Sequence, residues 1–121
     1  MLDTSPLTVA VERFADRLRA APQSRLQRGA AEAALELARE LSVRAQRLEA
    51  AARGSADAQG AAAEREMPDA GIFVVGDQVA VAGLDLAEAL RSAAPDGTKA
   101  PSAMLDEAVR LVELAEVRAM R

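Results

Sequence analysis

Few residues of this 121-residue chain could carry out chemistry, because histidine and cysteine are both absent. Their absence removes the commonest general bases, thiol nucleophiles and soft metal ligands, and leaves serines, carboxylates and one lysine. Lys99 precedes Ser102, which reverses the S-x-x-K order of serine acyl enzymes. The run from Asp96 to Lys99 lacks the full phosphate-loop pattern and is expected to be a plain turn. We therefore expect no catalytic residues, no enzymatic activity and no cofactor.

Two pairs of acidic residues could in principle hold a hard cation such as Mg²⁺, which prefers oxygen ligands. These pairs are Asp106 with Glu107 and Glu64 with Glu66. Neither pair lies in a stretch that resembles a calcium-binding loop. We expect solvated acids at both places and no bound metal.

The polar side of the helix expected over residues 24–53 carries a row of arginines that could bind an anion or an acidic partner: Arg25, Arg28, Arg39 and Arg47. Glutamates are interleaved with them at Glu32, Glu36 and Glu40, and this mixture is more typical of a solvated face. The net charge of −4 also disfavours nonspecific nucleic-acid binding, which needs a net basic surface. Anion binding by the arginine row is thus a speculative alternative, and nucleic acid is a disfavoured partner.

The helix expected from Ser24 to Arg53 organises the rest of the chain. Ser24 is a favourable N-cap and Gln27 stands three residues on, so the two predict a capping box, and Gly54 predicts a left-handed stop. At 1.5 Å per residue, about 29 helical residues span roughly 43 Å, which exceeds the roughly 35 Å expected for a compact domain of this size. The helix should therefore extend past its own core, and its apolar stripe is rich in alanine. These features predict that the chain pairs with itself as a homodimer.

A second helix is expected before this one, from Pro6 to about Ala21, and Pro22 should end it. The short connection between the two helices favours an antiparallel helical hairpin over residues 6–53. Residues 54–70 contain two glycines, a proline, four acids and hardly any large apolar side chain. A flexible loop is expected there, with a functional lid as the alternative.

The stretch from Gly71 to Ala82 predicts a β-hairpin. Two β-prone runs, 71–75 and 78–82, flank Gly76 and Asp77, and glycine in the first position suits a type II′ turn. One face of this hairpin would carry Phe73 and Val75, and its two open edges would be templates for another strand.

Four apolar residues are expected to bind a partner. Phe73 and Val75 would form the exposed face of the hairpin, while Leu35 and Val43 fall outside the main stripe of the long helix and offer a second contact surface. The alternative is that these are isolated exposed apolar residues, which are common on protein surfaces and need no functional explanation.

Two further helices are expected, over residues 86–94 and 101–120, because apolar residues recur at helical spacing in both. The fold class predicted is α+β and mostly helical, with a helical hairpin, one β-hairpin, a short helix and a C-terminal helix in a single domain over 1–121. The first residues contain Asp3 where a signal peptide would be basic, so a cytoplasmic location is expected.

The function expected from these features is a small noncatalytic interaction or regulatory protein that acts as a homodimer with a further protein partner. The first alternative is a small-ligand-binding module whose pocket lies between the β-hairpin and the helices, with arginines as anion anchors. The second alternative is nucleic-acid binding through the arginine row of the long helix.

Overall fold

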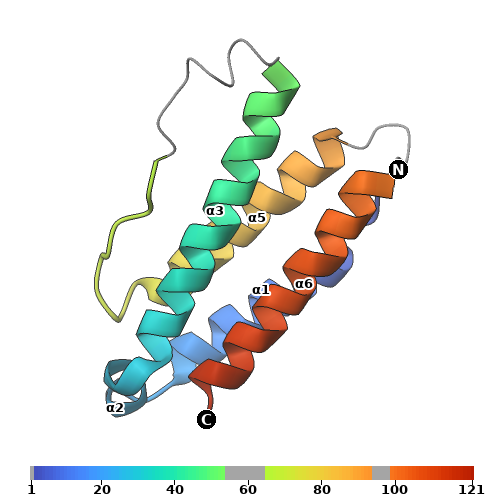
Figure 1. The fold of residues 1–121 in the computed structure, drawn as a ribbon. Coiled ribbons are helices and arrows are strands. Elements are labelled where there is room, and N and C mark those ends of the chain that lie inside the picture. Colours follow the sequence, from blue (N-terminus) through green and yellow to red (C-terminus); the bar gives the residue numbers. More distant parts are fainter. Residues whose placement is uncertain (1, 54–64, 94–98) are drawn as a thin grey trace.

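All regular secondary structure in the residues that the structure describes is helical. The structure is a computed structural model that describes residues 2–53, 65–93 and 99–121. No strand occurs in these residues (Figure 1), so the predicted α+β class is wrong. The elements in order are α1 (Ser5–Ala20), α2 (Gln23–Arg25), the kinked turn η1 (Leu26–Ala30), α3 (Ala31–Arg53), α5 (Val75–Ala93) and α6 (Lys99–Ala119).

The four long helices of the described residues form a bundle in which neighbours in sequence are not always neighbours in space. Helices α5 and α6 each pack against both α1 and α3, whereas α1 and α3 make almost no direct contact. Helices α1 and α6 run in one direction, and α3 and α5 run in the other (Figure 1). The first two long helices are therefore antiparallel, as the short connection predicted, but they do not pack directly against each other.

The core is continuous and draws on all four long helices. Phe14, one of the chain's two phenylalanines, is fully buried. Alanines fill much of the remaining interior, and their small side chains let the helices approach one another closely. The largest fully buried side chains are Phe14, Leu7, Leu18, Leu41, Leu86, Leu90, Val11, Val79 and Val112.

Helix α1 and its end agree with the sequence. It spans Ser5–Ala20 against the predicted 6–21, and its predicted inner residues Leu7, Val11, Phe14 and Leu18 are buried. Ala21 has an extended ψ of 142°, because the ring of Pro22 disfavours the helical conformation in the residue before it.

The expected long helix is broken at Gly29. This residue has φ 135° and ψ −13°, a conformation that only glycine adopts readily, and α3 begins two residues later. No side-chain cap is formed at α2, whose N-cap is Pro22, so the predicted capping box of Ser24 and Gln27 is wrong. At 1.5 Å per residue, α3 measures only about 35 Å, and the argument for a homodimer from an over-long rod no longer holds.

The predicted β-hairpin is replaced by the first half of α5. Val75, Val79, Ala82, Leu86 and Leu90 are all buried, and their spacing is that of one helix face. A two-stranded hairpin is marginal in water, whereas this helix buries one apolar face along its length against α1 and α3. Packing therefore outweighs the β-propensity of the valines, and the sheet edges that supported the dimer prediction do not exist.

An extended segment of residues 65–71, here called the strap, runs back along α3 to the start of α5 (Figure 1). Most of the loop predicted over 54–70, the helix stop at Gly54 and the acid Glu64 lie outside the described residues, as does the turn at 96–98. The last helix, α6, closely matches its prediction over 101–120.

Candidate protein-docking face

The outer side of α5 carries a group of exposed apolar side chains, here called the α5 face. Phe73 is 74% exposed, and Val81 and Leu84 are each 52% exposed. Val74 and Val81 are seven residues apart, which places them within about 20° of each other around the helix. Leu84 lies one turn beyond Val81 on the same side. The α5 face consists of Phe73, Val74, Val81 and Leu84.

Acidic residues lie within and beside the α5 face, because Asp77 follows Val74 by three residues and precedes Val81 by four on the same side of the helix. Asp77, Asp85 and Glu88 are exposed on the same helix, and Arg91 is its only basic residue. Glu88 lies 3.5 Å from Arg91, a separation that gives only a weak surface ion pair. Arg91 offsets part of this charge, as does Arg19 of α1, which pairs with Asp77, so the surroundings of the apolar residues are only slightly negative.

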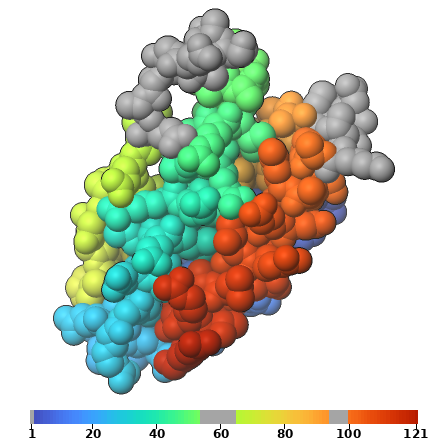
Figure 2. Space-filling view, viewed as in Figure 1, coloured from blue at the N-terminus to red at the C-terminus, as the bar shows by residue number. Residues whose placement is uncertain are grey.

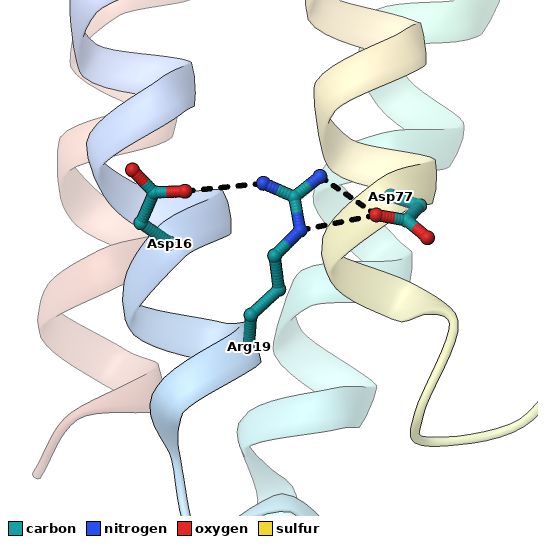
Figure 3. Close-up of polar contacts among 3 residues, drawn as sticks. All are labelled: Asp16, Arg19 and Asp77. Carbon is teal, nitrogen blue, oxygen red and sulfur yellow. Dashed lines mark hydrogen bonds and ion pairs between the residues drawn. The ribbon is translucent and has the colours of Figure 1, made fainter.

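One edge of the α5 face is held to α1 by Arg19 (Figure 3). Its Nε and Nη2 donate hydrogen bonds of 3.0 and 2.7 Å to Oδ1 of Asp77, and its Nη1 donates one of 3.1 Å to Asp16. The hydrogen bond to Asp77 raises the pKa of Arg19 above its ordinary value, so the guanidinium is charged at any ordinary pH. This cluster positions the first turn of α5 next to the last turn of α1.

The other edge is formed by the strap, which side chains of α3 and α5 hold in place. Gln46 both donates to the backbone oxygen of Arg65 and accepts from its N–H, each at 2.8 Å. Arg39 donates to the backbone oxygen of Met67 at 2.8 Å and pairs with Glu66 at 3.1 Å. Backbone groups of a segment without regular structure are thus satisfied by side chains of the bundle.

The turn that presents Phe73 is fixed by its own backbone. Gly71 has φ 100°, and its N–H donates to Oδ1 of Asp69 at 3.0 Å. The N–H of Val74 donates to the oxygen of Gly71 at 3.3 Å, and that of Gln78 donates to the oxygen of Val74 at 3.1 Å. Phe73 therefore projects from a defined turn at the start of α5.

The structure does not bring the four predicted partner-binding residues together. Phe73 is exposed as expected, but Val75 is only 2% exposed and belongs to the core. Leu35 is half-buried in the wall of a pocket, and Val43 is half-buried on α3 beside Arg65 and Glu66 of the strap. Partner binding by these residues stays a prediction, and Val75 has almost no surface left for it.

Val74, Val81 and Leu84 were not expected to form a surface. The predicted hairpin over residues 71–82 contains both valines, and side chains alternate between the two faces of a strand, so Val74 would lie on the opposite face from Phe73 and Val75. The signal that could have found them is their spacing, because 74, 81 and 84 follow the outer side of a helix just as 75, 79, 82 and 86 follow its inner side.

The predicted arginine row is divided by the break at Gly29. Arg25 and Arg28 lie at the kink and face the end of α6. Arg39 is half-buried and engaged with the strap, and Arg47 is exposed further along α3. The four arginines therefore do not form one continuous anion-binding row.

A pocket of about 500 Å³ lies between η1, the start of α3 and the junction of the strap with α5. Its volume falls in the range of small-molecule sites. The apolar part of its wall includes Leu26, Leu35 and Ile72. Its charged residues are Glu32, Asp69 and Arg39, so the wall carries more negative than positive charge.

Neither a metal-binding cluster nor a membrane-spanning helix is found in the described part of the chain. It contains no group of three or more carboxylate residues suited to holding a metal, and none of its helices is long and apolar enough to cross a bilayer. Asp106 is exposed, and Glu107 accepts a hydrogen bond of 3.1 Å from Arg44, which also contacts Glu40 at 2.7 Å. The hydrogen bond from Arg44 lowers the pKa of Glu107 and indicates an ordinary ion pair between α3 and α6.

Comparison with known proteins finds no matching family model, no matching curated protein and no matching solved structure.

Proposed function

We propose that this chain is a small noncatalytic protein-docking protein, and that the α5 face receives an amphipathic helix of a partner protein. The observation that carries the proposal is the position of Phe73, which is 74% exposed although the chain has only two phenylalanines and buries the other completely. Aromatic residues are enriched among the residues that dominate binding energy at protein interfaces. The surrounding valines and leucine extend the apolar surface along two turns of α5.

The charge around the α5 face specifies the kind of partner. Asp77 is already bound by Arg19, but Asp85 and Glu88 lie beside the apolar residues, so a partner helix with lysines or arginines beside its apolar stripe is complementary to the α5 face. A second copy of the same face is disfavoured because like charges would meet across the contact. The partner is therefore proposed to be a different protein with a basic amphipathic helix.

A synthetic peptide of leucine and lysine in helical register tests this proposal. Its binding is measured by fluorescence anisotropy, beside a peptide of the same composition in permuted order and a register-matched peptide of leucine and glutamate. Only the basic amphipathic peptide is expected to bind. Removal of a dominant interface residue by Phe73→Asp should weaken that binding by about 2 kcal/mol or more.

A matched pair of variants locates the binding site. Val81 lies on the α5 face and Val117 on α6, and their exposures are similar at 52% and 56%. Val81→Asp should weaken peptide binding, whereas Val117→Asp should leave it unchanged. Equal effects of the two variants, or equal binding of the acidic peptide, would rule out the α5 face as the docking site.

A small-ligand-binding module is the second candidate, and the pocket of about 500 Å³ beside the strap favours it. The pocket lies between the 69–78 segment and the residues of η1 and early α3, whereas the β-hairpin that was to form one wall of the predicted pocket does not exist. Its excess of carboxylates favours a neutral or cationic ligand over an anion. A thermal-shift screen tests this candidate, since a ligand that binds only the native state raises the melting temperature. A ligand effect abolished by Leu35→Asp and retained in Phe73→Asp would assign function to the pocket instead of the α5 face.

The homodimer and the cytoplasmic location stay predictions. The alanine stripe that was expected to meet a second chain is largely used within the bundle, where Ala30, Ala33, Ala34 and Ala45 are buried. Sedimentation equilibrium over a range of concentrations tests the dimer directly.

A further inference from the structure

Four arginines from two separate parts of the sequence surround one small pocket. Arg25 and Arg28 come from the kinked segment before α3, and Arg118 and Arg121 come from the end of α6. The pocket has a volume of about 220 Å³. Figure 2 shows the two contributing regions, light blue and red, side by side at one end of the molecule.

The break at Gly29 creates this arrangement. Its φ of 135° bends the chain, so Arg25 and Arg28 lie before the bend while α3 begins after it. Gly29 itself lines the pocket, and a Cβ atom built there meets nothing within 4 Å. The glycine is therefore required by the backbone conformation, and the space beside it is open.

The contacts within the protein use only part of the donor capacity of these arginines. Arg25 donates to the backbone oxygen of Arg121 at 3.2 Å, and Arg28 donates from Nε to the oxygen of Ser24 at 3.3 Å. Arg118 contacts Glu36 at 3.3 Å. Each guanidinium has five N–H donors, so most donors at the pocket are left for another acceptor.

The charge at the pocket is only partly balanced by its neighbours. Glu36 is the one side-chain carboxylate in the described residues that forms an ion pair with any of the four arginines, and Arg25 also contacts the main-chain oxygen of Arg121. The helix dipole favours positive side chains near the C-terminus of a helix, and this accounts for the presence of Arg118 and Arg121 at the end of α6. It does not account for Arg28, whose only hydrogen bond in the described residues is within its own turn.

We infer that this arginine pocket binds the phosphate group of a small phosphate monoester. Planar guanidinium groups match phosphate oxygens with paired hydrogen bonds, and several of them around one point offset the double charge of the group. The pocket is compact, and the basic surface does not continue along α3, because Glu32 and Glu36 lie on the first turns of that helix. A nucleic-acid backbone needs a longer basic track, so one phosphate group is the better match.

Titration with inorganic phosphate at constant ionic strength, followed by amide chemical shifts, tests the inference. Saturable shifts are expected for Gly29, Ala30, Ala33 and Ala119, which line the pocket. Arg28→Gln and Arg121→Gln should each weaken phosphate binding about tenfold or more, since each removes a charge-assisted hydrogen bond. A sugar phosphate should compete with inorganic phosphate, and the unphosphorylated sugar should not.

Arg110→Gln is the matched control, because Arg110 is an exposed arginine of α6 about 12 Å before Arg118 along the helix. It should leave the affinity for phosphate unchanged, and circular dichroism should show the same helix content in all three variants. The inference is overturned if Arg110→Gln weakens binding as much as Arg28→Gln, or if the shifts do not saturate. It is also overturned if a short single-stranded RNA binds through several phosphates, as judged from its salt dependence, while the sugar phosphate does not compete.

Discussion

Gly83 of α5 lies directly against Val11 of α1, so closely that a Cβ atom at residue 83 would be 2.6 Å from both γ-carbons of the valine. Val11 is 1% exposed, and its β-branched side chain has few alternative rotamers in a helix. Gly76, two turns earlier, makes a similar but looser approach, with its Cβ position 3.2 Å from the backbone oxygen of Ala15. Both glycines are used for close packing of two helices, although glycine in a helix interior lowers helix stability.

Gly83→Ala is expected to destabilise the protein. Alanine has the higher helix propensity by about 1 kcal/mol, but overpacking against Val11 should cost about 1–3 kcal/mol. Denaturant unfolding measures the net change in free energy. The double variant Gly83→Ala with Val11→Ala should show a favourable coupling between the two sites, because the smaller side chain relieves the overlap. A stabilised Gly83→Ala variant would contradict this packing of α1 against α5.

The first and last helices of the chain could be predicted well from the sequence, but the segment between them could not. The helices at Ser5–Ala20 and Lys99–Ala119 have regular apolar spacing and clear ends, and both predictions are confirmed. The stretch from Gly71 to Ala82 contains glycines that suit turns and valines that suit strands, and both local preferences pointed to a hairpin. Helical spacing across Val75, Val79 and Ala82 was the stronger signal, because it continues without a break into Leu86 and Leu90.

Gly29→Ala should destabilise the protein through the backbone alone. The residue has φ 135°, which side-chain-bearing residues rarely adopt, while its Cβ position is free of contacts. Forcing alanine into such a conformation costs about 1–3 kcal/mol. Thermal unfolding of Gly29→Ala, compared with Gln27→Ala at an exposed neighbouring position, measures this effect. Equal stability of the two variants would mean that the helix is not bent at Gly29.

Glu116 links α6 to α1 and should contribute to stability. Its side chain is 7% exposed, and its two oxygens accept hydrogen bonds of 3.0 Å from Arg13 and Arg17. Both arginines are about half exposed, so solvent screens the pairs, and Glu116→Ala should cost about 1–2 kcal/mol. Glu113→Ala, an exposed change on the same helix, is the control and should stay within about 0.5 kcal/mol of the wild type. Similar losses from the two substitutions would show that Glu116 has no special role.

The ion pair of Glu107 with Arg44 should make a small part of the stability depend on pH. Because the hydrogen bond from Arg44 lowers the pKa of Glu107 in the folded protein, the contribution is present above the unfolded pKa of about 4.3. It is lost as the pH falls through the lowered, folded value. Arg44→Gln should raise the pKa of Glu107, as followed by NMR of its carboxyl carbon. Arg110→Gln should raise the pKa of Glu107 less, because the charge of Arg110 lowers that pKa less than Arg44 does. A larger rise in the Arg110→Gln variant than in Arg44→Gln would contradict the pairing of Glu107 with Arg44.

Only part of the candidate site could be predicted from the sequence. Phe73 stood out because it is one of two aromatic residues and lies outside any helical stripe of the predicted elements. Val81 and Leu84 could not be joined to it while the segment was interpreted as strands and a turn. Arg25 and Arg28 could be suggested as anion ligands, but their approach to Arg118 and Arg121 depends on the bend at Gly29 and on the course of α6.

Tryptophan fluorescence tests the role of the α5 face most directly, because the chain contains no natural tryptophan. Phe73→Trp places one fluorophore within the proposed contact, at the start of α5, and Val117→Trp places one at an exposed position on α6. On addition of the basic amphipathic peptide, Trp emission of the Phe73→Trp variant should shift to shorter wavelength and become protected from acrylamide, while the Val117→Trp variant should not change. Binding of the peptide with no change in the Phe73→Trp variant would show that the docking site lies elsewhere.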